Sequence, residues 1–160
     1  MVIDFPFTPK SNSKLKAGHF WAIRLKNEKF GCGIVLAVPE DKKVEGTRSF
    51  YIGLLDWTSN IRPTIENLEA MPLRIIEQGH AHIKTISVQE EQILGIIDLT
   101  KNNLMSDLVV DSQIYSNTSY VLRDFQIIRK ATVLDHETLK TKSSWGYGVI
   151  IKLANHILAT

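Results

Sequence analysis

The stretch KAGHFWAIRLKNEKFGCGIVL, residues 16–36, determines the fold class that the sequence predicts. Residues 18–25 are rich in aromatic and β-branched side chains, and after a polar turn a second such run spans 30–38, so a β-hairpin is expected. In the second run large residues alternate with small ones such as Gly33, which leaves one strand face nearly bare at its start. Because a strand glycine is tolerated where another group lies against the backbone, we expect Trp21 of the partner strand to cover this gap.

The rest of the chain alternates short apolar runs with turn residues, which is typical of a β-rich fold. A third strand is expected over 49–57, with Tyr51 and Trp57 on one face, and Thr64 is expected to cap a short helix over 65–71. Weaker patterns predict strands over 73–77, 80–88, 93–99, 108–115 and 120–128, a helix over 135–142, and a strand followed by a short helix over 145–158. The predicted fold class is α+β and β-dominated: a strongly curved antiparallel sheet, or a small SH3-like barrel, with one or two flanking helices.

Length and composition indicate one domain. At 160 residues and 44% hydrophobic content the chain can bury one core, so we expect a single domain over 1–160, with an N-terminal arm over 1–15 and regular structure from Leu15 or Gly18 onward. Lys and Arg number 19 and Asp and Glu 17, so the net charge of +2 is far below that of a phosphate-binding protein, and nucleic acid is not an expected partner. The N-terminus lacks the pattern of a signal peptide, and the apolar runs are shorter than the roughly 20 residues that span a bilayer. We therefore expect a cytoplasmic protein with no membrane partner.

Few residues suggest catalysis or metal binding. His80 and His82 would lie on one face of a predicted strand and are weak candidates for a metal site, but Lys84 continues that face and would place a cation beside the metal. Cys32, the single cysteine, has apolar neighbours that would raise its pKa and leave it an inert core thiol. Two carboxylate pairs are expected to face solvent: Glu90 with Glu91, and Asp107 with Asp111. The sequence therefore predicts no metal, no cofactor and no enzymatic activity.

Large amphipathic side chains remain as candidates for binding a protein partner. Trp, Tyr and Arg dominate interface hot spots because they bury a large area and keep a polar group available. Trp57 and Arg62 border a loop, where an interface role and a core role are equally expected, so the stretch 57–62 is the first place to look for the partner. The residues predicted to bind a partner are Trp57, Arg62, Asp56, Tyr51 and Arg24.

Two blocks of the chain resemble the immunity protein 26 family of bacterial polymorphic-toxin systems. Block 16–36 is similar to the family's opening motif, and the matching positions are Gly18, Phe20, Ala22, Ile23, Leu25, Phe30, Gly33 and Val35. Block 79–99, GHAHIKTISVQEEQILGIIDL, is similar to a later block in which a His-Ile-Lys-Thr strand precedes an Ile-Gly strand, and it matches at His82, Ile83, Lys84, Thr85, Ile86, Leu94 and Gly95. One position differs: the motif's Gly is expected to be followed by a small acidic residue, whereas in this chain Gly18 is followed by His19. The resemblance implies a non-enzymatic protein that binds and neutralises a cognate toxin domain.

Two other interpretations stay open. Toxins of the PemK type also begin with a Gly and aromatic strand and a glycine-bearing second strand, which favours a ribonuclease or nucleic-acid-binding module on an SH3-like barrel. The modest net charge argues against this alternative. A small-molecule hydrolase that uses His80 and His82 rests on the weakest feature of the sequence. The sequence also leaves open whether the protein forms a homodimer and which toxin it would bind.

Overall fold

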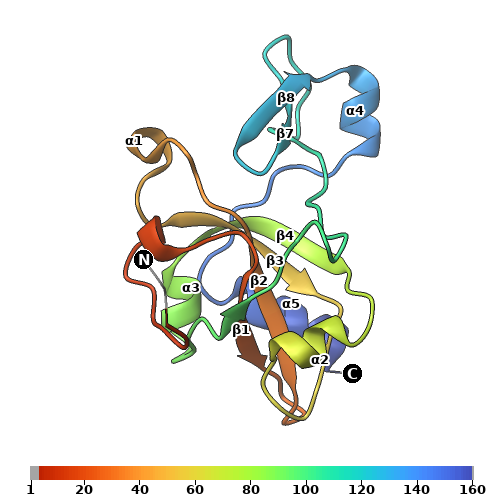
Figure 1. Ribbon diagram of the computed structural model, residues 1–160. Helices are drawn as coiled ribbons and strands as arrows, with labels where there is room; N and C mark the ends of the chain where they lie inside the picture. The colour runs from red at the N-terminus through yellow and green to blue at the C-terminus, as the bar shows by residue number, and fades with distance from the viewer. Residues whose placement is uncertain (1–3, 160) are drawn as a thin grey trace.

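The computed structural model describes residues 4–159, and its main body is an open five-stranded sheet (Figure 1). The strands are β1 (His19–Arg24), β2 (Phe30–Ala37), β3 (Ser49–Leu55), β4 (Ile75–His82) and β5 (Gly95–Ile96). They lie in the order β4-β3-β2-β1-β5, and every neighbouring pair is antiparallel. The predicted antiparallel sheet and its opening hairpin are confirmed. The SH3-like barrel is wrong, because over the described residues β4 and β5 remain the two edges of the sheet.

A smaller, three-stranded sheet stands apart from the main body at one end of the molecule (Figure 1). Its elements, in chain order, are β6 (Val109–Val110), β7 (Tyr120–Arg123), β8 (Gln126–Lys130) and the helix α4 (Val133–Thr138). We call residues 109–139 the small lobe. Its buried apolar cluster is small and centres on Val110, Val121 and Ala131. The small lobe is inserted between β5 and the last helix, α5 (Val149–Leu158), so the chain leaves the main body and returns to it.

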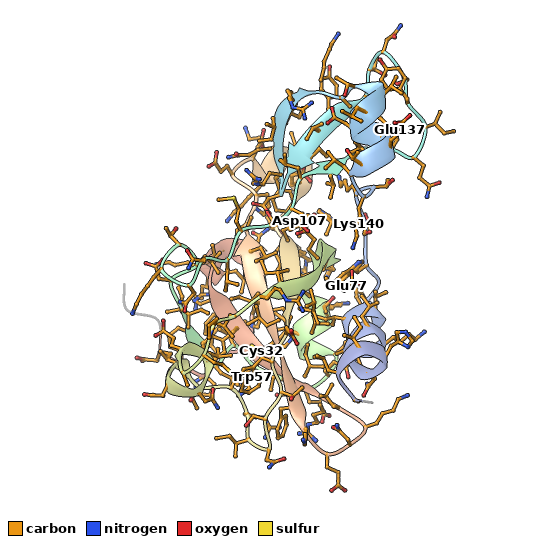
Figure 2. All side chains as sticks on the ribbon, turned by 90° about the vertical axis from the view of Figure 1, so that its right-hand side faces the viewer. Cys32, Trp57, Glu77, Asp107, Glu137 and Lys140 are labelled. Carbon is orange, nitrogen blue, oxygen red and sulfur yellow. The ribbon has the colours of Figure 1, made fainter. Side chains whose placement is uncertain are left out.

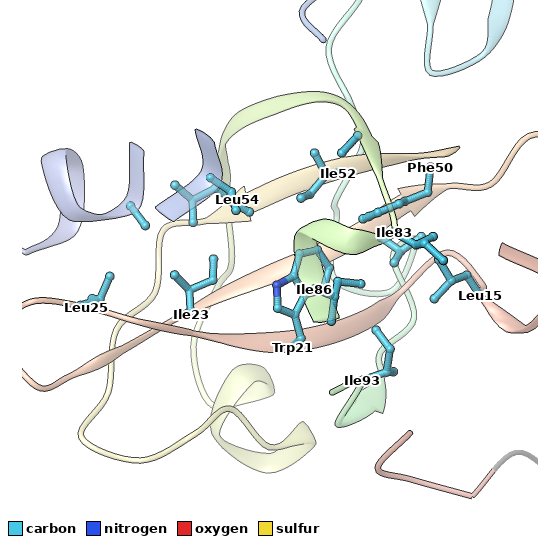
Figure 3. Packing of buried hydrophobic residues seen from close by; sticks show 14 residues of the cluster. Leu15, Trp21, Ile23, Leu25, Phe50, Ile52, Leu54, Ile83, Ile86 and Ile93 are labelled. Atoms are coloured by element: carbon cyan, nitrogen blue, oxygen red, sulfur yellow. The ribbon is translucent and has the colours of Figure 1, made fainter. Parts of the chain in front are cut away.

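The main sheet is buried on both faces. On one face, α5 and α3 (Lys84–Ser87) cover an apolar cluster that includes Trp21, Ile52 and Ile86 (Figure 3). On the other face, α2 (Ile65–Glu69) contributes Leu68 to a second cluster, which includes Phe20 and Ile34. Burial on both faces explains why the central strands consist of nearly continuous apolar runs.

Trp21 lies on the bare face of β2, as the sequence predicts. Trp21 and Gly33 are cross-strand partners, and a Cβ atom on Gly33 would lie 2.4 Å from Cζ2 of the indole ring. Glycine is therefore needed at this position so that the ring can lie against the backbone. The same arrangement recurs elsewhere in the sheet, where Trp145 lies on Gly79 and Phe20 on Gly95.

The structure differs from the expected strands between β3 and β5. The predicted strands 73–77 and 80–88 are instead the single strand β4 followed by the helix α3. Ile83 and Ile86 are both buried in the cluster around Trp21, and a spacing of three places two residues on one face of a helix but on opposite faces of a strand. The predicted strand 93–99 is reduced to β5, the two residues Gly95–Ile96.

Both ends of the chain also differ from expectation. The predicted arm 1–15 is packed on the main body over its described part, because Phe7 pairs with Ile93 and a 3-10 turn, η1 (Asn12–Lys14), precedes β1. In place of the strand predicted at the start of 145–158, Ser144 makes an isolated bridge to β4, and α5 begins only at Val149.

Local helix signals were more reliable. The Thr64 side chain accepts a hydrogen bond of 3.1 Å from the Asn67 backbone and caps α2, as predicted. The helix predicted over 135–142 is present as α4, which begins at Val133 because Thr132 supplies its cap. A short helix not predicted, α1 (Lys42–Glu45), lies in the loop before β3. Among the described residues, no helix has the length and apolar character to cross a bilayer.

We expect Gly33→Ala to destabilise the protein, because the added methyl group would overlap the Trp21 ring. Overpacking of this kind costs about 1–3 kcal/mol of unfolding free energy, which urea denaturation measures. Gly146→Ala is the matched control, since a Cβ atom there meets nothing within 4 Å. Equal stability of the two variants would contradict the contact between Trp21 and Gly33.

Candidate functional site

Two of the predicted partner-binding residues, Arg24 and Arg62, meet at one carboxylate. Arg24 is the last residue of β1, Arg62 lies in the loop between β3 and α2, and Glu91 lies in the loop between α3 and β5. Arg24 Nε and Arg62 Nη2 each lie 3.2 Å from Oε1 of Glu91, and Arg62 Nε donates to Oε2 at 3.4 Å. One buried side chain therefore fixes two arginines that come from different parts of the chain.

Burial is unequal across this group of three charges. The Glu91 side chain is 4% exposed, whereas those of Arg24 and Arg62 are 66% and 42% exposed. A buried carboxylate is tolerated when it is paired and hydrogen-bonded, as it is here. A guanidinium group has five N–H donors, of which Arg24 uses one and Arg62 two on Glu91, so donors remain directed to the surface.

The two arginines border an open cavity of about 300 Å³ at the end of the β1–β2 hairpin, which we call the arginine pocket. Its lining residues are Arg24, Leu25, Glu28, Lys29, Phe30 and Arg62. The guanidinium carbon of Arg62 lies 4.8 Å from the centroid of the Phe30 ring, which is a cation–π contact. With three cations and one carboxylate in its lining, the pocket is suited to an anionic group.

Main-chain hydrogen bonds hold the walls of the arginine pocket in place. The loop that carries Arg62 is fixed to β2, because Phe30 and Ser59 exchange backbone hydrogen bonds of 2.8 and 3.0 Å. The hairpin turn is closed by a bond of 2.9 Å from Leu25 N to the carbonyl oxygen of Lys29. The backbone of the pocket is therefore already ordered before a ligand binds. Binding would cost this part of the protein little further conformational entropy.

The other predicted partner-binding residues lie elsewhere. Trp57 is buried in the main body (Figure 2), and Tyr51 is buried in the same apolar cluster. The Tyr51 hydroxyl still accepts a hydrogen bond of 3.0 Å from Gln78 Nε2. Asp56 is exposed and accepts a hydrogen bond of 2.9 Å from Arg74. Of the five candidates, the structure brings together Arg24 and Arg62.

The histidine pair has surroundings of mixed charge, with cations near both rings and the Glu45 carboxylate 3.8 Å from His80 Nε2. Burial and the nearby Lys142 lower the pKa of His80, and Glu45 opposes that shift. Burial, followed by Lys84 and Arg48, lowers the pKa of His82. Within residues 4–159 no group of three or more His, Cys, Asp or Glu side chains is arranged to hold a metal ion. A metal site at His80 and His82 therefore gains no support from the geometry of the described residues.

Two buried groups have a structural role. Cys32 is fully buried, so its predicted core position is confirmed, and burial raises the pKa of its thiol. Burial and the nearby Lys16 lower the pKa of His19 to about 4. The neutral His19 ring accepts a hydrogen bond of 3.0 Å from Lys16 N and contacts Phe5 and Phe7 edge to face, so it fixes the N-terminal segment to β1.

Sequence reasoning missed Glu91, Lys29 and Phe30 as site residues. Glu91 was expected to face solvent with Glu90, and for Glu91 that expectation is wrong. A signal was present, because Glu91 is two residues before the buried Ile93 and shares its inward direction in an extended segment. Its two arginine partners, 67 and 29 residues away, could not be identified from spacing.

Comparisons with protein-family models, with curated proteins and with solved structures found no match to this chain.

We expect Glu91→Gln to destabilise the protein by about 1–2 kcal/mol, because hydrogen bonds to a charged group are stronger than those to a neutral amide. Urea denaturation measures this loss. Glu90→Gln is the matched control, since the adjacent Glu90 is exposed and should change stability by less than about 0.5 kcal/mol. If the two variants were equally stable, Glu91 would not be holding the arginines.

Proposed function

We propose that this protein binds and neutralises a cognate bacterial polymorphic toxin, without catalysis or a cofactor, in the cytoplasm of the cell that makes it. The observation that carries the proposal is the arginine pocket: two exposed guanidinium groups at the end of the β1–β2 hairpin, both bound by the buried carboxylate of Glu91. The resemblance of blocks 16–36 and 79–99 to toxin immunity proteins supplies the class of partner.

The chemistry of the arginine pocket suits a protein partner with an exposed carboxylate. Arginine binds carboxylates through paired N–H donors, and arginine is enriched among interface hot spots. Arg62 is also stacked on Phe30, which limits the side-chain entropy that binding would cost. We therefore propose that an Asp or Glu of the toxin enters the pocket between Arg24 and Arg62.

The same proposal holds that this protein does not itself have the catalytic activity of a toxin. Cys32 is enclosed in the core with a raised pKa and is not available as a nucleophile. The alternative nucleic-acid-binding module was predicted on an SH3-like barrel, whereas β4 and β5 are the two edges of an open sheet over the described residues. Binding rather than turnover is the function that these features favour.

The test is binding to the toxin encoded beside the gene, measured by titration calorimetry. We expect Arg24→Ala and Arg62→Ala each to weaken binding by roughly tenfold or more, as is typical of hot-spot residues. Arg74→Ala is the matched control, because Arg74 is an exposed arginine that pairs with Asp56 outside the pocket. Urea denaturation of each variant separates loss of binding from loss of folding.

Three outcomes would count against the proposal. Failure of the wild-type protein to bind the neighbouring toxin, or to protect cells from it, would remove the proposed function. Unchanged affinity of both arginine variants would remove the arginine pocket from the interface. Cleavage of RNA by the purified protein would favour the ribonuclease alternative instead.

A further inference from the structure

A second cavity is lined by residues of β4, of the small lobe and of the two connections between them. The small lobe lies at the end of the molecule away from the β1–β2 turn (Figure 1). The volume of this cavity is about 640 Å³, within the range of roughly 300–1,000 Å³ that is usual for ligand sites. We call it the interlobe cleft. Figure 2 shows Glu77, Asp107 and Lys140 beside it, where the main body meets the two connections to the small lobe.

Consecutive residues form the walls of the interlobe cleft. The segments are 75–78 of β4, 105–109 before and within β6, and 138–141, which begins with the last residue of α4. Successive side chains of a strand point to opposite faces, so when four consecutive residues line a cavity, the edge of the strand faces it. The cleft is therefore lined by main chain as well as by side chains.

β4 is an edge strand, and residues 143–145, which lead from the small lobe back to the main body, pair with only part of that edge. His80 N donates to the carbonyl oxygen of Ser143 at 2.8 Å, and Trp145 N donates to the carbonyl oxygen of His80 at 2.8 Å. Lys142 N turns instead to the carbonyl oxygen of Val110 in the small lobe, also at 2.8 Å. Added pairing on the edge of β4 therefore stops at His80.

The next outward-facing residue of β4 along this edge is Gln78. Main-chain groups in an antiparallel strand point alternately to its two neighbours, so those of Gln78 face the same side as those of His80. Among the described residues, no main-chain hydrogen bond from another segment meets Gln78 on that side. The segment 75–78 thus presents a free strand edge inside the cleft.

The width of the cleft is fixed by hydrogen bonds. Gln78 Oε1 accepts from Asp107 N at 2.7 Å, and Gln78 Nε2 donates to the Asp107 carbonyl oxygen at 3.1 Å. The Gln78 side chain therefore binds the first connection to the small lobe, while the pairing at His80 binds the second. Both connections are attached to β4, so the cleft is formed before any ligand enters it.

We propose that the interlobe cleft binds an extended, uncharged peptide segment of a second polypeptide, which adds a strand to residues 75–78 of β4. Strand addition is an established mode of peptide binding, in which main-chain hydrogen bonds give affinity and side-chain pockets give selectivity. The peptide would continue along β4 the pairing that residues 143–145 begin.

The lining indicates an uncharged and partly apolar segment. The charged side chains of the lining sum to a net charge of zero, because it contains two acidic and two basic residues: Glu77, Asp107, Arg123 and Lys140. Apolar walls are supplied by Ile75, Ile76, Leu108, Val109 and Leu139. A balanced lining does not favour an acidic or a basic peptide, whereas the apolar walls suit β-branched or aliphatic side chains. This proposal is independent of the arginine pocket and of the toxin.

The test is selection from a random-peptide display library against the full chain, followed by calorimetry with the selected peptides. We expect uncharged peptides with aliphatic or β-branched residues to be enriched. Thr138→Trp fills the cleft from α4 and should weaken their binding at least tenfold. Glu137→Trp places the same ring one residue earlier on α4, outside the cleft lining, and should leave binding unchanged.

Other results would overturn this proposal. These are enrichment of charged peptides, enrichment of none, or equal binding by Thr138→Trp and the wild type. A dimer that Thr138→Trp abolishes would show that a second copy of this chain is the occupant, and not a separate peptide. Arg24→Ala should retain peptide binding, which separates failure of this proposal from failure of toxin binding.

Discussion

The contact of the Trp21 indole ring with the backbone of Gly33 is the constraint on which the rest of the structure depends. It fixes β1 against β2 in one register, because a slip by one residue would place a Cβ atom under the ring and turn the apolar residues of both strands to the wrong faces. In that register Arg24 lies opposite Phe30 at the end of the hairpin. The geometry of the arginine pocket therefore follows from a contact in the core.

The arginine pocket combines two opposite electrostatic environments. Glu91 is withdrawn from water and lines a cavity of about 30 Å³ together with Trp21, while the two arginines that it holds extend outward. The cost of removing the Glu91 carboxylate from water is part of the free energy of folding, so a partner that binds does not add to it. The exposed arginines keep N–H donors available for that partner. The interlobe cleft, by contrast, offers a neutral strand edge, so the two sites suit different ligands.

Features set by neighbouring residues could be predicted from the sequence. The hairpin, the position of Trp21 and the Thr64 cap each depend on a pattern within about 20 residues. Features set by distant residues could not. The pattern of residues 80–88 did not reveal that Ile83 and Ile86 are both buried by a helical turn. Arg24 and Arg62 were predicted as separate candidates, and the structure shows that both bind Glu91. The elements of the small lobe were predicted in part, over 108–115, 120–128 and 135–142, but no pattern within a single segment could show that they form a separate sheet.

The most direct measurement of the central claim is amide hydrogen exchange of this protein, alone and in complex with the toxin encoded beside its gene. Binding through the arginine pocket predicts added protection at residues 25–30 and 59–62, where the hairpin turn and the Arg62 loop line the pocket. Protection confined to other surfaces, with exchange at these residues unchanged, would contradict the account.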